Sequence, residues 1–259
     1  RMLSIREVLE VNRFICRATK AHDKKVFVGH PIQASKEELY DYLAEIADES
    51  PDGVSMLYPE RFFGQADPII DFVSAPKQFG LEIVVHESKL VSGFDGSLIN
   101  WPRALIKQLV SELDIKAIKE DSFDDGLSDF IFEQSQIHDF VFILAGGGKQ
   151  RLLPFLDRGI RTWLNGTTVF LPGFIDETYM GFVSHDSEFI DSYLKKIEKP
   201  FFGECVKKFG WHLAHKAALS FFGYGEPVER FPHAQVTKDM LTKVSVCLDG
   251  IASAVGELH

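Results

Sequence analysis

The chain has 259 residues, of which 45% are hydrophobic and 25% are charged, and its formal net charge is −10. This is the composition of an ordinary globular protein, long enough for one large domain or two small ones. The acidic balance argues against a nucleic-acid surface and against binding to anionic membranes. No apolar run reaches the roughly 18 residues that a membrane-spanning helix needs.

Along the chain, short β-rich runs alternate with longer segments of helical periodicity. The pattern predicts six strands, over residues 26–30, 53–58, 82–87, 115–120, 140–148 and 161–168. An amphipathic helix precedes the first strand, and a helical segment follows each strand. Ser35 and Glu38 have the spacing of a capping box at the start of one such helix. Beyond about Pro172 only helices are expected, most clearly over residues 204–223 and 237–258.

Strict alternation of strands and helices predicts an α/β fold with a parallel sheet. Two architectures fit, an open doubly wound sheet and a (β/α)8 TIM barrel. No GxGxxG follows the first strand, and AGGGKQ (145–150) lacks the spacing of a P-loop, so a nucleotide binder is disfavoured. A barrel needs two more strands than the six counted. We therefore expect upstream residues or a neighbouring chain to cover the unpaired edges.

The cysteines and a pair of histidines indicate the cellular compartment and whether a metal site is expected. Cys16, Cys205 and Cys247 lie far apart and form no CxxC pair, which is typical of free thiols in a reducing compartment, so we expect a cytoplasmic protein. His212 and His215 share a helix face without an evident third ligand. No metal and no cofactor are expected.

Two lysines, Lys116 and Lys119, lie in the strand predicted at 115–120. Side chains alternate along a strand, so the two point to opposite faces. Lys116 is near the strand start, while Lys119 is near the carboxyl end, where parallel α/β folds build active sites. A desolvated Lys119 would lose its proton and could attack a carbonyl group. The alternative is a surface lysine paired with Glu120 or Asp121.

The segment KAIKED (116–121), with the serine after it, resembles the GIKE-(A/D)-S strand of the dihydrodipicolinate synthase / N-acetylneuraminate lyase family. Five further segments are similar to motifs of that family in the same order: VFVGHPIQASKEEL, DGVSMLYP, GLEIVVHESKLVSG, LDRGIRTWLNGTTVFLP and HKAALSFFG. The similarity extends over residues 3–258, and it equates the six strands with the family's strands three to eight.

The resemblance implies a (β/α)8 barrel over residues 1–172, with the last barrel helix and a C-terminal helical segment over 173–259. It implies a homo-oligomer, either a dimer or a tetramer. It also implies that Lys119 forms a Schiff base with pyruvate or a related 2-keto acid, since the motif places the family's catalytic lysine there.

The sequence departs from the family at several site positions. His86 stands where the family has a proton-shuttling tyrosine, and Val91 where it has a carboxylate-binding arginine. Glu60 and Arg61 replace an aromatic pair. His86 is either a proton shuttle with a near-neutral pKa or a polar residue at a strand end, and the sequence leaves both open.

Substrate-binding candidates come from three other segments. Gly146, Gly147 and Gly148 precede a helix, and they form either a cradle of backbone N–H groups for a carboxylate or a tight turn with positive φ. Asn165, at the end of the last predicted strand, either binds substrate or satisfies a turn. Tyr58 either offers a hydroxyl or packs at a strand end.

The sequence thus predicts a Schiff-base-forming lyase or aldolase, or a dehydratase, in which Lys119 is the nucleophile and His86 moves protons. The alternative is a catalytically degenerate barrel that binds a small acid or a partner protein without turnover.

Overall fold

The structure is a computed structural model of the chain, and it describes residues 3–32, 35–57, 66–88, 100–146, 148–231 and 233–258. The chain divides into two compact units, residues 1–146 (unit 1) and residues 147–259 (unit 2). This division falls earlier in the chain than the end of the predicted strand–helix units at residue 172.

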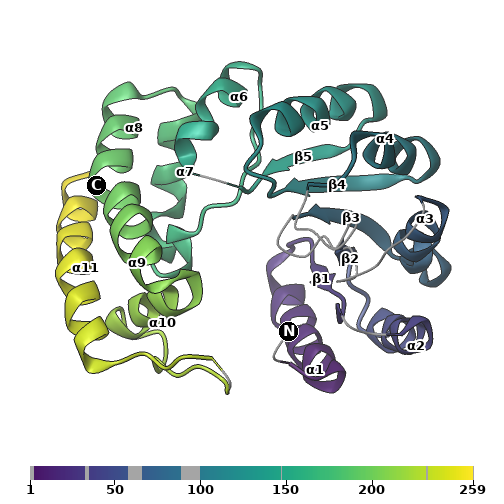
Figure 1. Cartoon of the computed structure of the whole chain (residues 1–259), viewed down its shortest axis with the longest axis horizontal. Coiled ribbons are helices and arrows are strands. Elements are labelled where there is room, and N and C mark those ends of the chain that lie inside the picture. Colours follow the sequence, from purple (N-terminus) through teal and green to yellow (C-terminus); the bar gives the residue numbers. More distant parts are fainter. Residues whose placement is uncertain are drawn as a thin grey trace. The chain divides into compact units, whose positions relative to one another are not determined.

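Unit 1 alternates strands and helices (Figure 1). Its strands are β1 (Phe27–Gly29), β2 (Gly53–Leu57), β3 (Glu82–Glu87), β4 (Ile115–Glu120) and β5 (Val141–Leu144). Its helices are α1 (Ile5–Thr19), η1 (Lys20–His22), α2 (Lys36–Ala47), α3 (Ala66–Ser74), η2 (Ala75–Phe79), α4 (Arg103–Glu112) and α5 (Asp125–His138). The strands pair in parallel in the order β1-β2-β3-β4-β5. A doubly wound sheet reverses its strand order at a switch point, and this sheet does not, so its winding is that of a barrel.

Local signals explain where the first helices begin. Ser35 and Glu38 form the predicted capping box of α2, because the Ser35 hydroxyl accepts from the Glu38 N–H while the Glu38 carboxylate accepts from the Ser35 N–H. Ser4 and Glu7 form a second box at α1. These contacts satisfy N–H groups that have no partner inside a helix.

The core of unit 1 lies between the sheet and its helices. The fully buried apolar side chains of the strands and of α2 include Val54, Met56, Ile83, Val85, Leu39, Leu43 and Ile46. One polar cluster fastens α1 and α2 to β1: the Asn12 amide donates to the carbonyl of Gly29 (2.8 Å) and to the Tyr42 hydroxyl (2.7 Å). Tyr42 in turn donates to Gly29 (2.7 Å).

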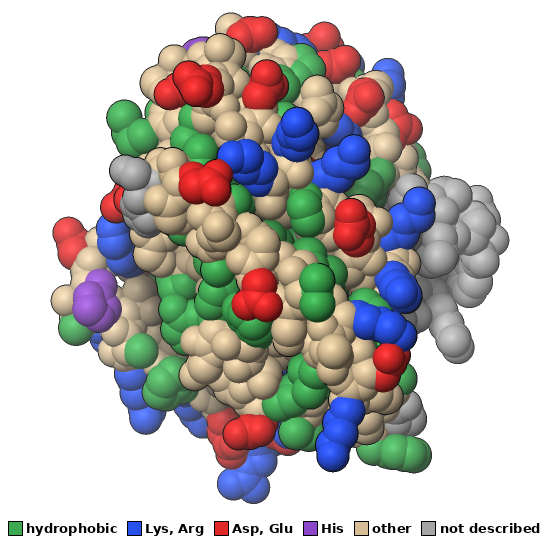
Figure 2. All heavy atoms as spheres, turned by 90° about the vertical axis from the view of Figure 1, so that its left-hand side faces the viewer, with side chains coloured by type: hydrophobic (Ala, Val, Ile, Leu, Met, Phe, Trp, Pro, Cys, Tyr) green, Lys and Arg blue, Asp and Glu red, His purple; other side chains and the backbone are tan. Residues whose placement is uncertain are grey.

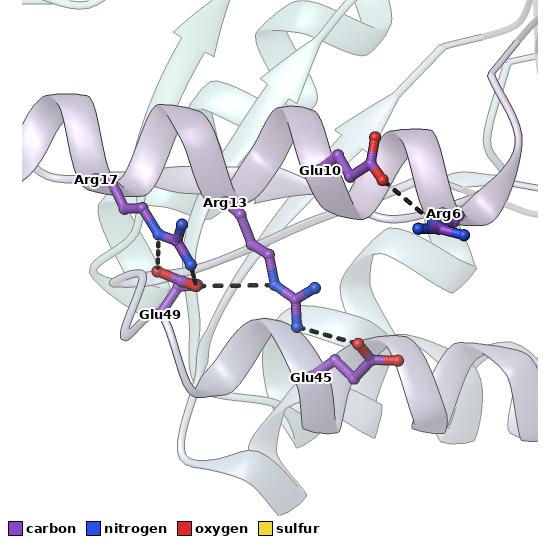
Figure 3. A network of polar contacts seen from close by, with 6 residues as sticks. All are labelled: Arg6, Glu10, Arg13, Arg17, Glu45 and Glu49. Carbon is purple, nitrogen blue, oxygen red and sulfur yellow. Dashed lines mark hydrogen bonds and ion pairs between the residues drawn. The ribbon is translucent and has the colours of Figure 1, made fainter.

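Ion pairs also connect α1 with α2 and with the turn after it (Figure 3). Arg13 contacts Glu45 at 3.0 Å and Glu49 at 3.7 Å, and the Arg17 Nε donates to Glu49 at 2.9 Å. A single ion pair at the surface contributes little to stability. Glu49, however, contacts the guanidinium groups of both Arg13 and Arg17, and its pKa is lowered, chiefly by the hydrogen bond from Arg17.

Unit 2 is helical in its described part (Figure 1). Its helices are η4 (Lys149–Arg151), α6 (Leu153–Asp157), η5 (Thr167–Val169), η6 (Pro172–Phe174), α7 (Ile175–Val183), α8 (Ser187–Tyr193), η7 (Leu194–Val206, a π-helix), α9 (Lys207–Phe209), α10 (Trp211–Phe221) and α11 (Lys238–Leu258). The helix predicted over 204–223 is divided at Gly210, which has φ 85°.

The sixth predicted strand, residues 161–168, is wrong. Trp163 makes a single isolated bridge, and Thr167 already begins a 3-10 turn. The Asn165 side-chain oxygen accepts the N–H of Thr167 (3.2 Å), so a local hydrogen bond takes the place of a strand ladder.

No helix in the described part of the chain is long and apolar enough to cross a membrane. On the face shown in Figure 2, lysine and arginine side chains lie among aspartate and glutamate side chains. This face therefore has mixed charge rather than one sign.

Candidate active site

Lys119 and His86 lie side by side at the carboxyl ends of adjacent strands. They are register partners in the parallel β3–β4 ladder, and the Lys119 Nζ is 3.1 Å from the His86 Nε2. Partners in a ladder point to the same face of the sheet. The fold thus brings together the two residues expected to carry the chemistry.

A register shift makes this pairing possible. Ile83 pairs with Ile115, but the next residue of β3, Val84, pairs with Ala117, so one residue of β4 is passed over. Without the shift, His86 would lie opposite Ile118. The irregularity at the start of β4 therefore decides that a base, rather than an apolar side chain, is the neighbour of His86.

Burial depresses the basicity of both groups. The pKa of Lys119 is lowered by desolvation, against an opposing effect of the Asp121 carboxylate. The pKa of His86, whose side chain is 17% exposed, is also lowered by desolvation first and by the Lys119 charge, while Asp121 raises it. An amine in such surroundings is more readily neutral and hence nucleophilic.

Asp121 is a member of the cluster that sequence reasoning treated only as a possible ion-pair partner of Lys119. Its Oδ2 is 3.5 Å from the His86 Nε2, and its side chain is 24% exposed. Its backbone N–H donates to the carbonyl of Glu87 (2.9 Å), which fastens the chain after β4 to the end of β3. The sequence signal for Asp121 was an acid directly after β4, two residues beyond Lys119.

Lys116 contrasts with Lys119, as its position at the strand start predicted. Its side chain is 42% exposed, and its Nζ lies 3.1 and 3.2 Å from the two carboxylate oxygens of Asp114. That contact raises the pKa of Lys116. Two lysines in one strand thus have opposite environments, and Lys116 is a natural internal control.

The opposite face of the same two strands carries a pair of buried acids that sequence reasoning missed. Glu87 and Glu120 are register partners and are fully buried. Glu87 accepts from the N–H of Trp101 (3.1 Å), and Glu120 accepts from the N–H of Ser122 (2.7 Å) and from its hydroxyl. Burial, aided by the Glu120 charge, raises the pKa of Glu87 to about 7.

The described part of the glycine loop, Gly146 and Gly148, gives little support to either expectation. The N–H of Gly146 donates to the carbonyl of Glu120 (3.0 Å), so it already has an acceptor inside the protein. Gly148 has φ −84°, and neither it nor Gly146 is among the positive-φ glycines of the described chain. A Cβ added at Gly148 would overlap the Glu198 carboxylate, so the two residues pack closely. Gly147 and Tyr58 lie outside the described residues.

Lys149, directly after this loop, belongs to a buried pair within unit 2. Its N–H donates to the Glu198 Oε1 (2.7 Å), and both side chains are nearly inaccessible. Burial lowers the pKa of Lys149 and raises that of Glu198. The Lys149 side chain therefore lies inside unit 2, close enough to Glu198 for each charge to oppose the effect of burial on the other's pKa.

The Asn165 side-chain oxygen satisfies a turn. The Oδ1 accepts from the N–H and hydroxyl of Thr167 (3.2 and 2.8 Å) and from the Tyr193 hydroxyl (3.1 Å). The Nδ2 is buried without a hydrogen-bond partner among the described residues. Asn165 and Gly148 belong to unit 2, whereas Lys119, His86 and Gly146 belong to unit 1.

The histidine pair noticed in α10 does not form one site. His215 is buried with its ring centroid 4.1 Å from that of Trp211, whereas His212 has its ring centroid 5.8 Å from that of His233. Within the described ranges, no group of three or more histidine, cysteine or acidic side chains has a metal-binding arrangement.

Neither a family model nor a curated protein sequence matches the chain. Several solved structures, by contrast, are similar to the chain. The 4-hydroxy-tetrahydrodipicolinate synthase of Methylacidiphilum fumariolicum SolV superimposes with a TM-score of 0.80 and 19% identity, over 99% of this chain and 82% of that one. A catalytic-lysine mutant of the sialic acid aldolase of Ruminococcus gnavus gives 0.79 and 10% identity over the same shares.

A third similar structure is a prophage protein of the dihydrodipicolinic acid synthase family from E. coli K12 in complex with pyruvate. Its TM-score is 0.75 and its identity 16%, over 97% of this chain and 83% of that one. At such identities the likeness shows the fold. Together with the unreversed order of the parallel strands, it shows that this chain has the α/β fold of the TIM barrels, with additional C-terminal helices.

Proposed function

We propose that the chain is a Schiff-base-forming lyase or aldolase of the dihydrodipicolinate synthase / N-acetylneuraminate lyase type, acting on pyruvate or a related 2-keto acid. The observation that carries the proposal is the contact between the Lys119 amine and the His86 imidazole at the carboxyl end of a parallel sheet. Two features support it further: the KAIKED motif around Lys119, and a fold shared with synthases and an aldolase.

The proposed chemistry begins with the neutral amine of Lys119. Its lone pair attacks the ketone carbon, and the carbonyl electron pair moves to oxygen, which takes a proton from His86. The attached nitrogen then gives one of its protons, through His86, to this hydroxyl group, which leaves as water and leaves a protonated imine on Lys119. The imine withdraws electrons, so loss of a proton or of a carbon substituent at the adjacent carbon forms an enamine. Condensation, carbon–carbon cleavage or dehydration then proceeds from that enamine.

The first prediction tests the nucleophile. The wild-type chain is incubated with pyruvate or a 2-keto-3-deoxy sugar acid, treated with borohydride, and weighed intact. We expect the mass of one reduced adduct in wild type and its loss in Lys119→Ala, because borohydride traps only an imine. Lys116→Ala is the matched control, since Lys116 lies in the same strand but is half-exposed and paired with Asp114.

An adduct that persists in Lys119→Ala and disappears in Lys116→Ala would contradict the assignment. If no adduct forms in wild type with any of a panel of keto acids, the non-catalytic binding barrel becomes the better description. The family resemblance also leads us to propose a homo-oligomer, either a dimer or a tetramer. The three separated free cysteines support the proposal of a cytoplasmic protein.

A further inference from the structure

Three groups meet at one nitrogen in the proposed site. The His86 Nε2 faces the Lys119 Nζ at 3.1 Å and the Asp121 Oδ2 at 3.5 Å. Within the described chain these are the polar contacts of the His86 side chain. A ring nitrogen carries either one hydrogen or one lone pair, so it cannot serve both neighbours in the same way at the same time.

The carboxylate makes the two states of this nitrogen unequal. With a lone pair on Nε2, the imidazole can accept an N–H from the Lys119 ammonium, but the lone pair then also faces the negative charge of Asp121. With a hydrogen on Nε2, the same carboxylate is an acceptor or, for the imidazolium, an ion-pair partner. Asp121 therefore favours the protonated nitrogen.

Asp121 acts more strongly on His86 than on Lys119. Its ion-pair contact is with the histidine, and Asp121 has no direct contact with Lys119 among the interactions of the described residues. When a proton moves from the Lys119 ammonium to the His86 Nε2, one N–H bond breaks and one forms. The positive charge thereby moves toward the carboxylate, which makes the transfer less unfavourable.

Among the described residues, the other neighbours of His86 in the sheet add no charge on its face. On β2 its register partner is Leu57, an apolar residue whose N–H donates to the buried His30. The acids Glu87 and Glu120 are the next residues along β3 and β4, so they point to the opposite face of the sheet.

We infer that Asp121 is a positioning residue, which holds a proton on His86 and stabilises the imidazolium formed when His86 takes the proton of the Lys119 ammonium. This inference rests on the proposed function, because it assigns Asp121 a part in freeing the Lys119 nucleophile. Asp121 sets the pH at which the histidine–lysine pair releases its proton. It also keeps on His86 the proton that the departing ketone oxygen needs.

The test uses Asp121→Asn, which removes the charge at nearly constant shape, and Asp121→Glu, which restores it. Asp114→Asn is the matched control, because it removes a carboxylate from the other end of the same strand, beside Lys116. The full chain is titrated by NMR with labelled histidine and no substrate. His86→Gln identifies the His86 signal among the nine histidines.

We expect the His86 pKa to fall by about one unit in Asp121→Asn, to recover in part in Asp121→Glu, and to stay unchanged in Asp114→Asn. In borohydride trapping with pyruvate, the midpoint of the pH–rate profile of Asp121→Asn should move to lower pH. Its plateau rate should fall about tenfold or more, because proton transfer to the ketone oxygen is impaired.

An unchanged His86 titration in Asp121→Asn overturns the inference, and so does a lowered titration with an unaltered trapping profile. The proposed function fails separately. If wild type forms no adduct with keto acids, Lys119 is not a working nucleophile, while the histidine titration still decides whether Asp121 holds the proton on His86.

Discussion

At the scale of single residues, one physical effect acts in opposite directions on the two faces of β3 and β4. On the face with His86 and Lys119, burial favours the loss of protons, because the charged forms of these bases are the poorly solvated ones. On the other face the same burial favours the retention of protons by Glu87. Residues adjacent in sequence thus have pKa values shifted in opposite directions: those of His86 and Lys119 are lowered, and that of Glu87 is raised.

Replacing Glu87 with glutamine should make the protein more stable at about pH 8 and leave its stability almost unchanged at about pH 4. The pKa of Glu87 is about 7 in the fold and 4.5 ordinarily, so between these values the folded state holds more protons. Stability is therefore lost as pH rises through this window, by at most about 3 kcal/mol. Glutamine keeps an acceptor for the N–H of Trp101 and never ionises.

Urea unfolding at the two pH values measures this effect, with Glu82→Gln as the control from the same strand. Glu82 is only partly buried, whereas Glu87 is fully buried. A Glu87→Gln protein that gains the same stability at both pH values would show that the gain comes from packing and not from the avoided charge.

At the scale of elements, the start of β2 is pressed against β3. Gly53 is buried and pairs with Glu82, and a Cβ added at Gly53 would overlap the backbone carbonyl of Glu82. A backbone carbonyl held in a ladder cannot move aside as a flexible side chain does. By contrast, a Cβ added at Gly29 in β1 has no heavy atom within 4 Å.

Gly53→Ala should therefore destabilise the protein by roughly 1–3 kcal/mol, the usual effect of overpacking, and shift the β2–β3 ladder. Gly29→Ala should change stability by no more than about 0.5 kcal/mol. Chemical unfolding of both variants measures the difference, and equal effects of the two substitutions would contradict it.

Several elements could be predicted because their signals are local. The strands at 82–87 and 115–120 have the bounds that their apolar runs indicated, and α2 begins at its capping box. The sixth strand could not, because the competing hydrogen bonds of Asn165 are invisible in a residue pattern that is itself strand-like. Nor does periodicity reveal the register shift that places His86 opposite Lys119.

At the scale of the whole molecule, the barrel-type fold was accessible from the order of six motifs along the chain, since each constrains the next. The site was accessible only in part. Lys119 and His86 follow from motif positions, whereas Asp121 and the Glu87–Glu120 pair depend on which strands become neighbours and in what register. The sequence also could not show that the Gly146 N–H donates to the carbonyl of Glu120, an acceptor within the protein.

The pH dependence of stability is a property of the whole molecule, because it sums over every group whose pKa changes on folding. His30 opposes Glu87 in that sum. It is buried at the end of β1, accepts the N–H of Leu57 (2.9 Å), and has its Nδ1 3.1 Å from the Pro31 carbonyl oxygen. Desolvation lowers its pKa to about 4, against the ordinary 6.5.

As pH falls from about 6.5 to 4, the unfolded chain binds a proton at His30 before the folded chain does, so stability is lost in that direction. Glu87 has the opposite sign over an overlapping window, since its contribution is lost as pH rises from about 4.5 to 7. Each contribution is about 3 kcal/mol at most, so the two nearly cancel between about pH 4.5 and 6.5.

Single substitutions should reveal the two opposing pH dependences of the unfolding free energy. Compared with wild type, Glu87→Gln should become more stable as pH rises through this interval, and His30→Gln should become less stable. The double variant should regain a dependence close to that of wild type, because other titrating groups are common to all four proteins. Unfolding free energies at four or five pH values measure the slopes. Parallel curves for wild type and His30→Gln would contradict the argument, because they would mean that His30 titrates alike in the folded and unfolded chain.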